Sequence, residues 1–227
     1  LGVVYGGIGD HKKAKNLLNH SLFIYKKYFP KNYTEIAWTL AHLGNVYIRE
    51  GNYEKAKNLA EQSFFVYKNY IPKSHPGAAW ALTYLGIANR NLGDYEKAKN
   101  LFEQGLLIYK NHFSDNHIDV AWTLGQLGIT YQKLGNYKKA KEVLSRSLNI
   151  HTNLLGYNNI RTSSERIKLG DIYKEAGDFK TAKNLLEEGL RAYENHYGDS
   201  HIKTAQVLRK VGEIYFLEGN MELAEHL

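Results

Sequence analysis

Apolar and polar residues alternate with helical spacing along almost the whole chain, and the same pattern returns every 42 positions. The pattern is clearest in residues 93–109, GDYEKAKNLFEQGLLIY, whose apolar members are Tyr95, Ala98, Leu101, Phe102, Leu106 and Tyr109. This spacing predicts an amphipathic helix with one buried face. Close relatives of the stretch occupy residues 51–67 and 135–151, so it is a structural unit that the chain repeats.

A second helix is expected before each copy of this stretch. A Leu-Gly pair marks it at Leu43-Gly44, Leu85-Gly86, Leu127-Gly128 and Leu169-Gly170. A turn glycine follows at Gly51, Gly93, Gly135 and Gly177, the residue type that ends a helix in the left-handed conformation. An alanine in each second helix, at Ala56, Ala98, Ala140 and Ala182, indicates close approach by a neighbour. Each repeat is therefore predicted to be a helix A, a tight turn, a helix B and a linking loop.

One such helix pair cannot bury its apolar face alone, so stacked pairs must share a continuous core. We expect a single array with a partial unit at 1–37, full units at about 38–79, 80–121, 122–163 and 164–205, and a partial unit at 206–227. Both ends fall inside predicted helices, which favours a fragment of a longer chain whose ends lack capping repeats.

The pattern L-x-x-L-G-x-x-Y followed by G-x-Y-x-x-A resembles the tetratricopeptide repeat. It is represented here by Leu82, Leu85, Gly86, Gly93, Tyr95 and Ala98. That family usually repeats every 34 or so residues. The longer period and the histidine before helix A, as at His75, His117 and His201, resemble the kinesin-light-chain subclass. The resemblance implies an all-α, right-handed superhelical solenoid of stacked antiparallel helix pairs, with the A helices lining a concave groove that holds a peptide or partner domain.

The resemblance also implies which residues face this groove. The candidate binding residues are Trp38, Asn45, Arg49, Trp80, Ile87, Arg90, Trp122, Ile129, Gln132 and Lys133. The three tryptophans share one register, which fits either a ladder of interface anchors along the groove or indoles packed between adjacent A helices. Both interpretations stay open at this point.

The repeat that begins near residue 164 departs from its neighbours. Arg166 replaces a leucine, and Asn159 stands where other repeats have histidine. Ordinary drift of a degenerate repeat is the favoured explanation. The alternative is a locally altered superhelix, or a groove that becomes charged through Lys168, Asp171, Lys174 and Glu175.

The chain carries a formal net charge of +7 and has a pI near 9.2, which favours acidic partners. The lysines on the B helices alternate with glutamates, however, so a solvated surface is expected and nucleic-acid binding is not. No apolar run approaches the roughly 18 residues that span a bilayer, so no membrane span is predicted. The chain contains no cysteine, which excludes disulfides and thiol chemistry.

Catalytic motifs are not evident in the sequence, and we expect neither an enzyme nor a cofactor. The histidines His75, His117 and His201 lie 42 or 84 positions apart, one in each loop, so convergence on one metal ion is not expected. We predict that each instead makes hydrogen bonds in the loop or at the N-terminus of helix A.

The sequence therefore predicts a non-enzymatic, cytoplasmic scaffold that binds a protein or peptide, with an upstream secretion signal as an open alternative. The second hypothesis is an accessory sensor or self-association segment of a larger multidomain protein, such as a nucleotide-binding regulatory ATPase. Self-association through the uncapped ends belongs to this second hypothesis.

Overall fold

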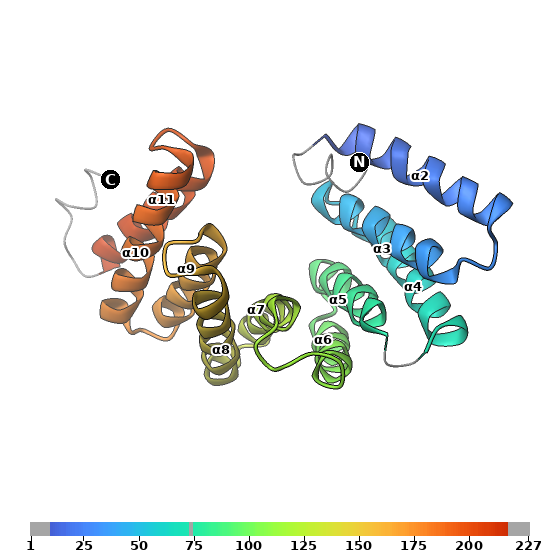
Figure 1. Ribbon diagram of the computed structural model, residues 1–227. Coiled ribbons are helices and arrows are strands. Elements are labelled where there is room, and N and C mark those ends of the chain that lie inside the picture. The colour runs from blue at the N-terminus through green and yellow to red at the C-terminus, as the bar shows by residue number, and fades with distance from the viewer. Residues whose placement is uncertain (1–9, 73–74, 218–227) are drawn as a thin grey trace. The chain divides into compact units, whose positions relative to one another are not determined.

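The computed structural model describes residues 10–72 and 75–217, and these residues form ten helices and no strand (Figure 1). The chain divides into two compact units, 1–115 and 116–227, each of which is considered by itself. Within the described ranges, none of the helices is both long and apolar enough to cross a membrane.

Both units consist of alternating A and B helices. The first contains α2 (His11–Tyr28), α3 (Tyr33–Arg49), α4 (Tyr53–Tyr70), α5 (Pro76–Asn91) and α6 (Tyr95–Lys110). The second contains α7 (Ile118–Lys133), α8 (Tyr137–Leu155), α9 (Ile160–Glu175), α10 (Phe179–Tyr197) and α11 (Ile202–Leu217). The odd-numbered helices are the A helices of the predicted repeat, and the even-numbered helices are its B helices.

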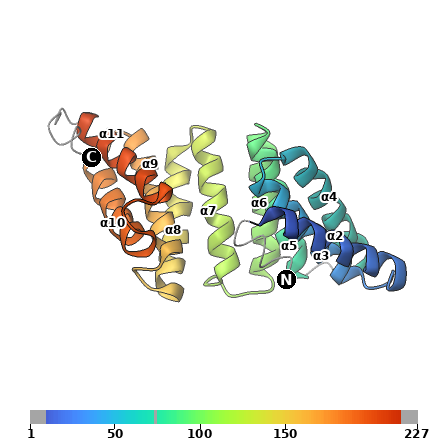
Figure 2. The ribbon, with the colours of Figure 1, turned by 90° about the horizontal axis from the view of Figure 1, so that it is seen from above.

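Stacked helix pairs build each unit, as the sequence predicts. In the first unit α3 packs on α4, α5 packs on α6, and both α3 and α4 contact α5. In the second unit α7 lies beside α8 (Figure 2), α9 packs on α10, and α9 also contacts α7, α8 and α11. Within the described residues, each A helix thus contacts a B helix and, inside its unit, a neighbouring A helix.

The A helices begin earlier than the unit boundaries expected from the sequence. They start at Pro76, Ile118 and Ile160, four residues before the expected boundaries at 80, 122 and 164. The 42-residue step is kept, so only the phase differs. The tryptophan that marks the expected boundary lies one turn inside the helix, because the residue that caps the helix precedes it by five positions. Residues 1–9 and 218–227 of the expected partial units lie outside the described residues.

The turn between the A and B helices is built as the glycine pattern predicts. Gly93 adopts a φ of 92°, a conformation that residues with a Cβ rarely take. The side chain of the next residue, Asp94, then accepts a hydrogen bond from the backbone N–H of Lys97 at 3.1 Å and caps α6. The same cap is made by Asn52, Asn136 and Asp178 at the corresponding turns.

Small residues let the two helices of a pair come close together. The register alanines Ala56, Ala98, Ala140 and Ala182 are fully buried, which confirms the expected close approach. The glycine of the Leu-Gly pair serves the same contact: a Cβ added to Gly128 would lie 2.4 Å from Cγ of Leu144 in the paired B helix. The Leu-Gly signature is therefore a packing requirement.

Candidate functional site

Trp38 and Trp80 lie in one aromatic cluster on the A helices of the first unit. The ring centroid of Trp38 in α3 lies 4.1 Å from that of His42, one turn further along the same helix. The ring of His42 in turn lies 5.9 Å from Trp80 and 6.3 Å from Tyr84, both in α5. Both tryptophans are half-buried, so part of each indole remains accessible to solvent.

His42 is the centre of this cluster. Burial lowers the pKa of His42 from 6.5 to about 4, so its imidazole is neutral at physiological pH. Its Nε2 atom is buried and has no hydrogen-bond partner. The cluster is therefore an uncharged aromatic surface, which suits apolar or aromatic side chains of a ligand and also cations that approach a ring face.

The other predicted binding residues of the first unit differ in how accessible they are. Arg49 is exposed near the end of α3, and Asn45 and Arg90 are half-buried. Burial lowers the pKa of Arg90 to about 10, and the group remains cationic at neutral pH. Ile87 is only 7% exposed, so it supports the A helices from inside and offers little surface to a partner.

The predicted residues of the second unit are all on α7. Trp122, Ile129 and Gln132 are half-buried, and Lys133 is exposed. Gln132 donates a hydrogen bond from Nε2 to Oε1 of Glu175 in α9 at 2.8 Å, which links two A helices through side chains of the candidate face.

Helix α9 continues this polar face and joins it to α11. Lys174 Nζ lies 2.6 Å from Glu213 Oε2, and Lys210 of α11 pairs with Asp171. Lys168 Nζ donates to Oε1 of the buried Glu165 at 2.5 Å. Three of the charged residues that the sequence singles out on α9, Lys168, Asp171 and Lys174, thus occur in charge pairs, and the fourth, Glu175, accepts the hydrogen bond from Gln132.

Arg166 is accommodated by a compensating set of contacts. The side chain is 3% exposed, and its guanidinium carbon lies 3.6 Å from the ring centroid of Tyr157. One terminal nitrogen donates to the backbone carbonyl of Tyr157 at 2.9 Å, and Nε lies 3.3 Å from Oε2 of Glu188. The Tyr157 hydroxyl donates to the same carboxylate oxygen at 2.6 Å, and this hydrogen bond raises the pKa of Tyr157. The departure from leucine is therefore matched by specific partners.

A pocket of about 480 Å³ lies beside this network. Its lining includes Tyr157, Glu188, Arg191 and His196, from the loop before α9 and from α10. A second pocket, of about 440 Å³, lies in the first unit and is lined by residues of α2, α3 and α4 that include Tyr47 and Lys55. The described residues contain no group of three or more His, Cys, Asp or Glu side chains that could hold a metal ion.

The loop histidines cap the A helices, as the sequence predicts. Nδ1 of His75 accepts from the backbone N–H of Gly77 at 3.1 Å, and His117 and His201 make the same bond at 3.2 Å. Asn159, which replaces histidine in the next repeat, accepts from the N–H of Arg161 through Oδ1 at 2.9 Å. Histidine and asparagine therefore make the same kind of cap at this position.

Lysines of the B helices lie over tyrosine rings of the A helices. Nζ of Lys141 lies 5.0 Å from the ring centroid of Tyr173, and Lys183 lies 5.2 Å from that of Tyr215. Lys15 and Lys55 both lie over Tyr47, at 5.4 and 5.5 Å. Part of the basic stripe expected to be only solvated therefore makes cation–π contacts between helices.

The fold is that of a helical-repeat protein, because antiparallel helix pairs recur every 42 residues. The A helices are capped, and small residues form the contact inside each pair. A family model described as tetratricopeptide repeat matches residues 1–69, 35–111, 77–153, 119–195 and 163–227. The chain therefore belongs to the tetratricopeptide repeat family, as its sequence pattern predicts. A search of curated proteins finds no match.

Solved structures with a similar fold include kinesin-light-chain-like proteins. BtubC (BKLC) from P. vanneervenii matches at 20% identity, over 95% of this chain and 87% of that chain, with a TM-score of 0.78. A putative kinesin light chain from Podosopora anserina with nearly identical TPR-like repeats matches at 21% identity, over 87% and 93%, with a TM-score of 0.66. The apo form of RapI matches at 18% identity, over 100% and 77%, with a TM-score of 0.70. These similarities concern the fold.

Sequence reasoning missed two members of the aromatic cluster, His42 and Tyr84. Each follows a tryptophan of its own helix by four positions, so each lies on the same helical face one turn later. That spacing was the available signal. The signal is weak, because this position of the repeat holds a different residue type each time: histidine, tyrosine, glutamine and then lysine.

Proposed function

We propose that the protein is an interaction scaffold that binds a peptide or a partner domain on the face of its A helices. The observation that carries the proposal is the aromatic cluster on consecutive A helices, in which the rings of Trp38, His42 and Trp80 are partly accessible and the buried ring of Tyr84 supports them. Half-buried tryptophans are strong interface anchors, because they add a large contact area and lose little rotamer freedom on binding. Membership of the tetratricopeptide repeat family supports this use of the A helices.

The two units offer different chemistry to a partner. The aromatic cluster of the first unit suits an apolar or aromatic side chain. The α7 and α9 face of the second unit, with Gln132, Glu175 and Lys174, suits a polar segment that exchanges hydrogen bonds with side-chain pairs. Exposed Arg49 and Lys133 and the net charge of +7 support a partner with acidic residues. A non-enzymatic role in the cytoplasm stays a prediction.

The experiment selects peptides from a random-peptide display library on the purified full chain and measures their dissociation constants. The test variant replaces Trp38, Trp80 and Trp122 by alanine. We expect affinity to fall at least about tenfold, the scale of an interface anchor. The control is Phe65→Ala, which removes an exposed aromatic ring from a B helix. Undiminished binding by the triple variant, with its helical content kept, would rule the proposal out.

A further inference from the structure

A row of exposed apolar side chains runs across the B helices of the first unit. Phe23 in α2, Phe65 in α4 and Leu107 in α6 are 42 positions apart and are 56, 58 and 61% exposed. Three residues after each of them, on the same helical face, comes an exposed lysine. These lysines are Lys26, Lys68 and Lys110. The two sets, six residues in all, are called the basic-apolar rows below.

The three helices that carry the rows are joined through the A helices between them. Leu18 of α2 and Leu59 of α4 belong to one apolar cluster, and Val66 of α4 and Ile108 of α6 pack against the next. Helix α4 is covered by α3 and α5, yet Phe65 is as exposed as Phe23. The side chains of the rows are therefore exposed because of their position in the repeat. The exposure of Phe23 does not result from the place of α2 at the start of the described chain.

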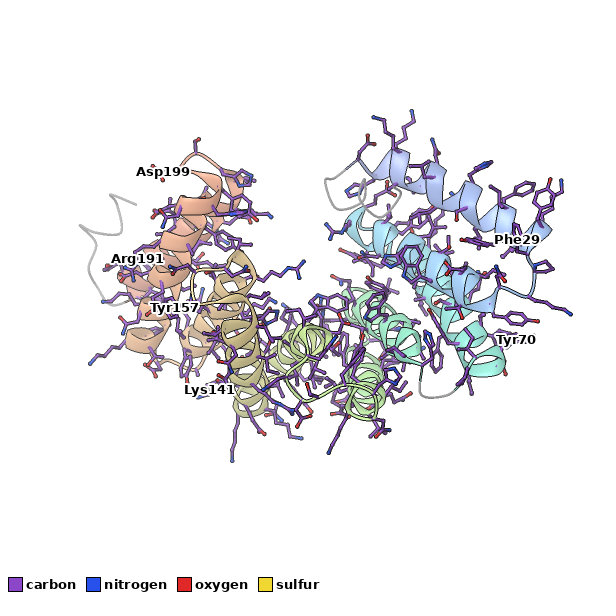
Figure 3. All side chains as sticks on the ribbon, in the orientation of Figure 1. Phe29, Tyr70, Lys141, Tyr157, Arg191 and Asp199 are labelled. Carbon is purple, nitrogen blue, oxygen red and sulfur yellow. The ribbon has the colours of Figure 1, made fainter. Side chains whose placement is uncertain are left out.

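Further aromatic residues extend the rows to the ends of the helices. Tyr28, Phe29 and Tyr70 are 60, 52 and 53% exposed. The ring of Tyr70 stacks on Tyr33 at 4.4 Å, and the backbone N–H of Asn32 donates to the carbonyl of Phe29 at 2.9 Å. Figure 3 shows Phe29 and Tyr70 at the same end of the first unit. Tyr70 also lies 6.4 Å, centroid to centroid, from the ring of Phe65, so it directly extends that row.

The second unit has the same repeat but lacks the rows. The corresponding pairs there are Asn149 with Thr152 in α8 and Arg191 with Glu194 in α10. These B helices are capped and packed like those of the first unit, so neither helix formation nor core packing requires apolar residues at these positions. The first unit therefore carries an additional surface feature that folding does not explain.

The rows are basic as well as apolar. Residues 23–31, 65–72 and 107–114 contain Lys26, Lys27, Lys31, Lys68 and Lys110 but no Asp or Glu. A lysine in the last turn of a helix has an ordinary explanation in the helix dipole. That explanation does not extend to the rings beside it, such as Phe23 and Tyr28, which lie 5.4 and 5.0 Å from Nζ of Lys27.

We propose that the basic-apolar rows dock the first unit onto an anionic lipid surface. Phe and Tyr side chains that are more than half exposed can enter the boundary between headgroups and acyl chains, where aromatic residues are enriched. The lysines beside them can extend toward anionic headgroups, whose charge complements theirs. A protein partner would require the same charge, but side chains that protrude from three separate helices fit a broad planar surface better than a single binding segment.

The test is flotation of the full chain with vesicles of phosphatidylcholine alone and of phosphatidylcholine mixed with phosphatidylserine. We expect binding to the phosphatidylserine vesicles only, and weaker binding as salt is raised. One variant combines Phe23→Asn, Phe65→Asn and Leu107→Asn, and the other combines Lys26→Thr, Lys68→Thr and Lys110→Thr. Both copy residues that the second unit already uses, so the fold is expected to persist. Each should lower vesicle binding at least about tenfold.

The matched control is Leu154→Asn, which removes an apolar side chain that is 48% exposed from the second unit and should leave binding unchanged. The proposal is overturned if the wild-type chain does not bind phosphatidylserine vesicles, if it binds both kinds of vesicle equally, or if both triple variants bind like the wild type. Binding of an acidic protein through the rows, without vesicle binding, would also overturn it. Should the apolar variant fail to fold, the lysine variant decides alone.

Discussion

His42 makes the stability of the first unit depend on pH. Burial lowers its pKa to about 4 in the folded protein, against 6.5 in an unfolded chain. Between these values the unfolded chain binds a proton that the folded chain does not, so the free energy of unfolding falls as pH is lowered. From pH 7 to pH 4.5 the loss from this group should be roughly 2 to 3 kcal/mol.

Urea denaturation of the wild type and of His42→Gln at both pH values checks this prediction. Glutamine occupies the same register at Gln126, so the variant should fold. Between pH 7 and pH 4.5 the free energy of unfolding of the variant should fall less than that of the wild type, and the difference should be roughly 2 to 3 kcal/mol. Equal pH dependence of the two proteins would show that His42 is not buried in its neutral form.

Arg166 tests whether the irregular repeat depends on its compensating contacts. Removing the carboxylate by Glu188→Gln leaves a buried guanidinium with weaker partners, and this should destabilise the protein by about 1 to 3 kcal/mol. In an Arg166→Leu background, which restores the leucine of other repeats, the same change should be nearly neutral. Chemical denaturation of the four proteins gives the coupling energy. A coupling energy near zero would show that Arg166 and Glu188 do not stabilise each other.

At the scale of the element, the start of each A helix depends on one side-chain acceptor. His117→Ala removes the Nδ1 atom that accepts from the N–H of Asp119, and this should lower the free energy of unfolding by about 1 kcal/mol. His117→Asn, which copies the cap that Asn159 makes in the next repeat, should preserve most of the stability. Thermal denaturation followed by circular dichroism distinguishes the two. If alanine were tolerated as well as asparagine, the cap would not matter.

Contact between the paired helices can be tested at Gly128. A Cβ there would lie 2.4 Å from Leu144, so Gly128→Ala should destabilise α7 and α8 by roughly 1 to 3 kcal/mol through overpacking. In a Leu144→Ala background the added methyl group has room, and the same change should have little further effect. Denaturation of both pairs of proteins provides the measurement. If Gly128→Ala lowered the free energy of unfolding equally in the two backgrounds, the contact with Leu144 would not be the cause of the loss.

The elements could be predicted from the sequence because their signals are local and recur. The turn at Gly93, the close approach at Ala98 and the cap at His75 each need only a few neighbouring residues, and each is confirmed. The residue at which each unit begins was harder to predict. Trp80 is the most conspicuous residue near the start of α5, but the helix begins at Pro76, directly after its cap.

At the scale of the whole molecule, contacts between repeats determine the chemistry of the candidate site and were harder to foresee. The pairing of Arg166 with Glu188 joins two helices, and the contact of His42 with Trp80 depends on how each A helix is rotated about its axis. A single sequence does not specify that rotation. The pattern did specify the tryptophan register, and whether these residues bind a partner stays a prediction.

The intrinsic fluorescence of the chain tests the central claim most directly, because its three tryptophans, Trp38, Trp80 and Trp122, are all candidate binding residues. A peptide selected on the full chain should shift or quench the emission of a Trp122→Phe variant, which retains Trp38 and Trp80. The fluorescence titration should give the same dissociation constant as an independent binding assay. The account would be contradicted if the peptide bound without changing the emission of this variant and if Trp38→Ala and Trp80→Ala left the affinity for the peptide unchanged.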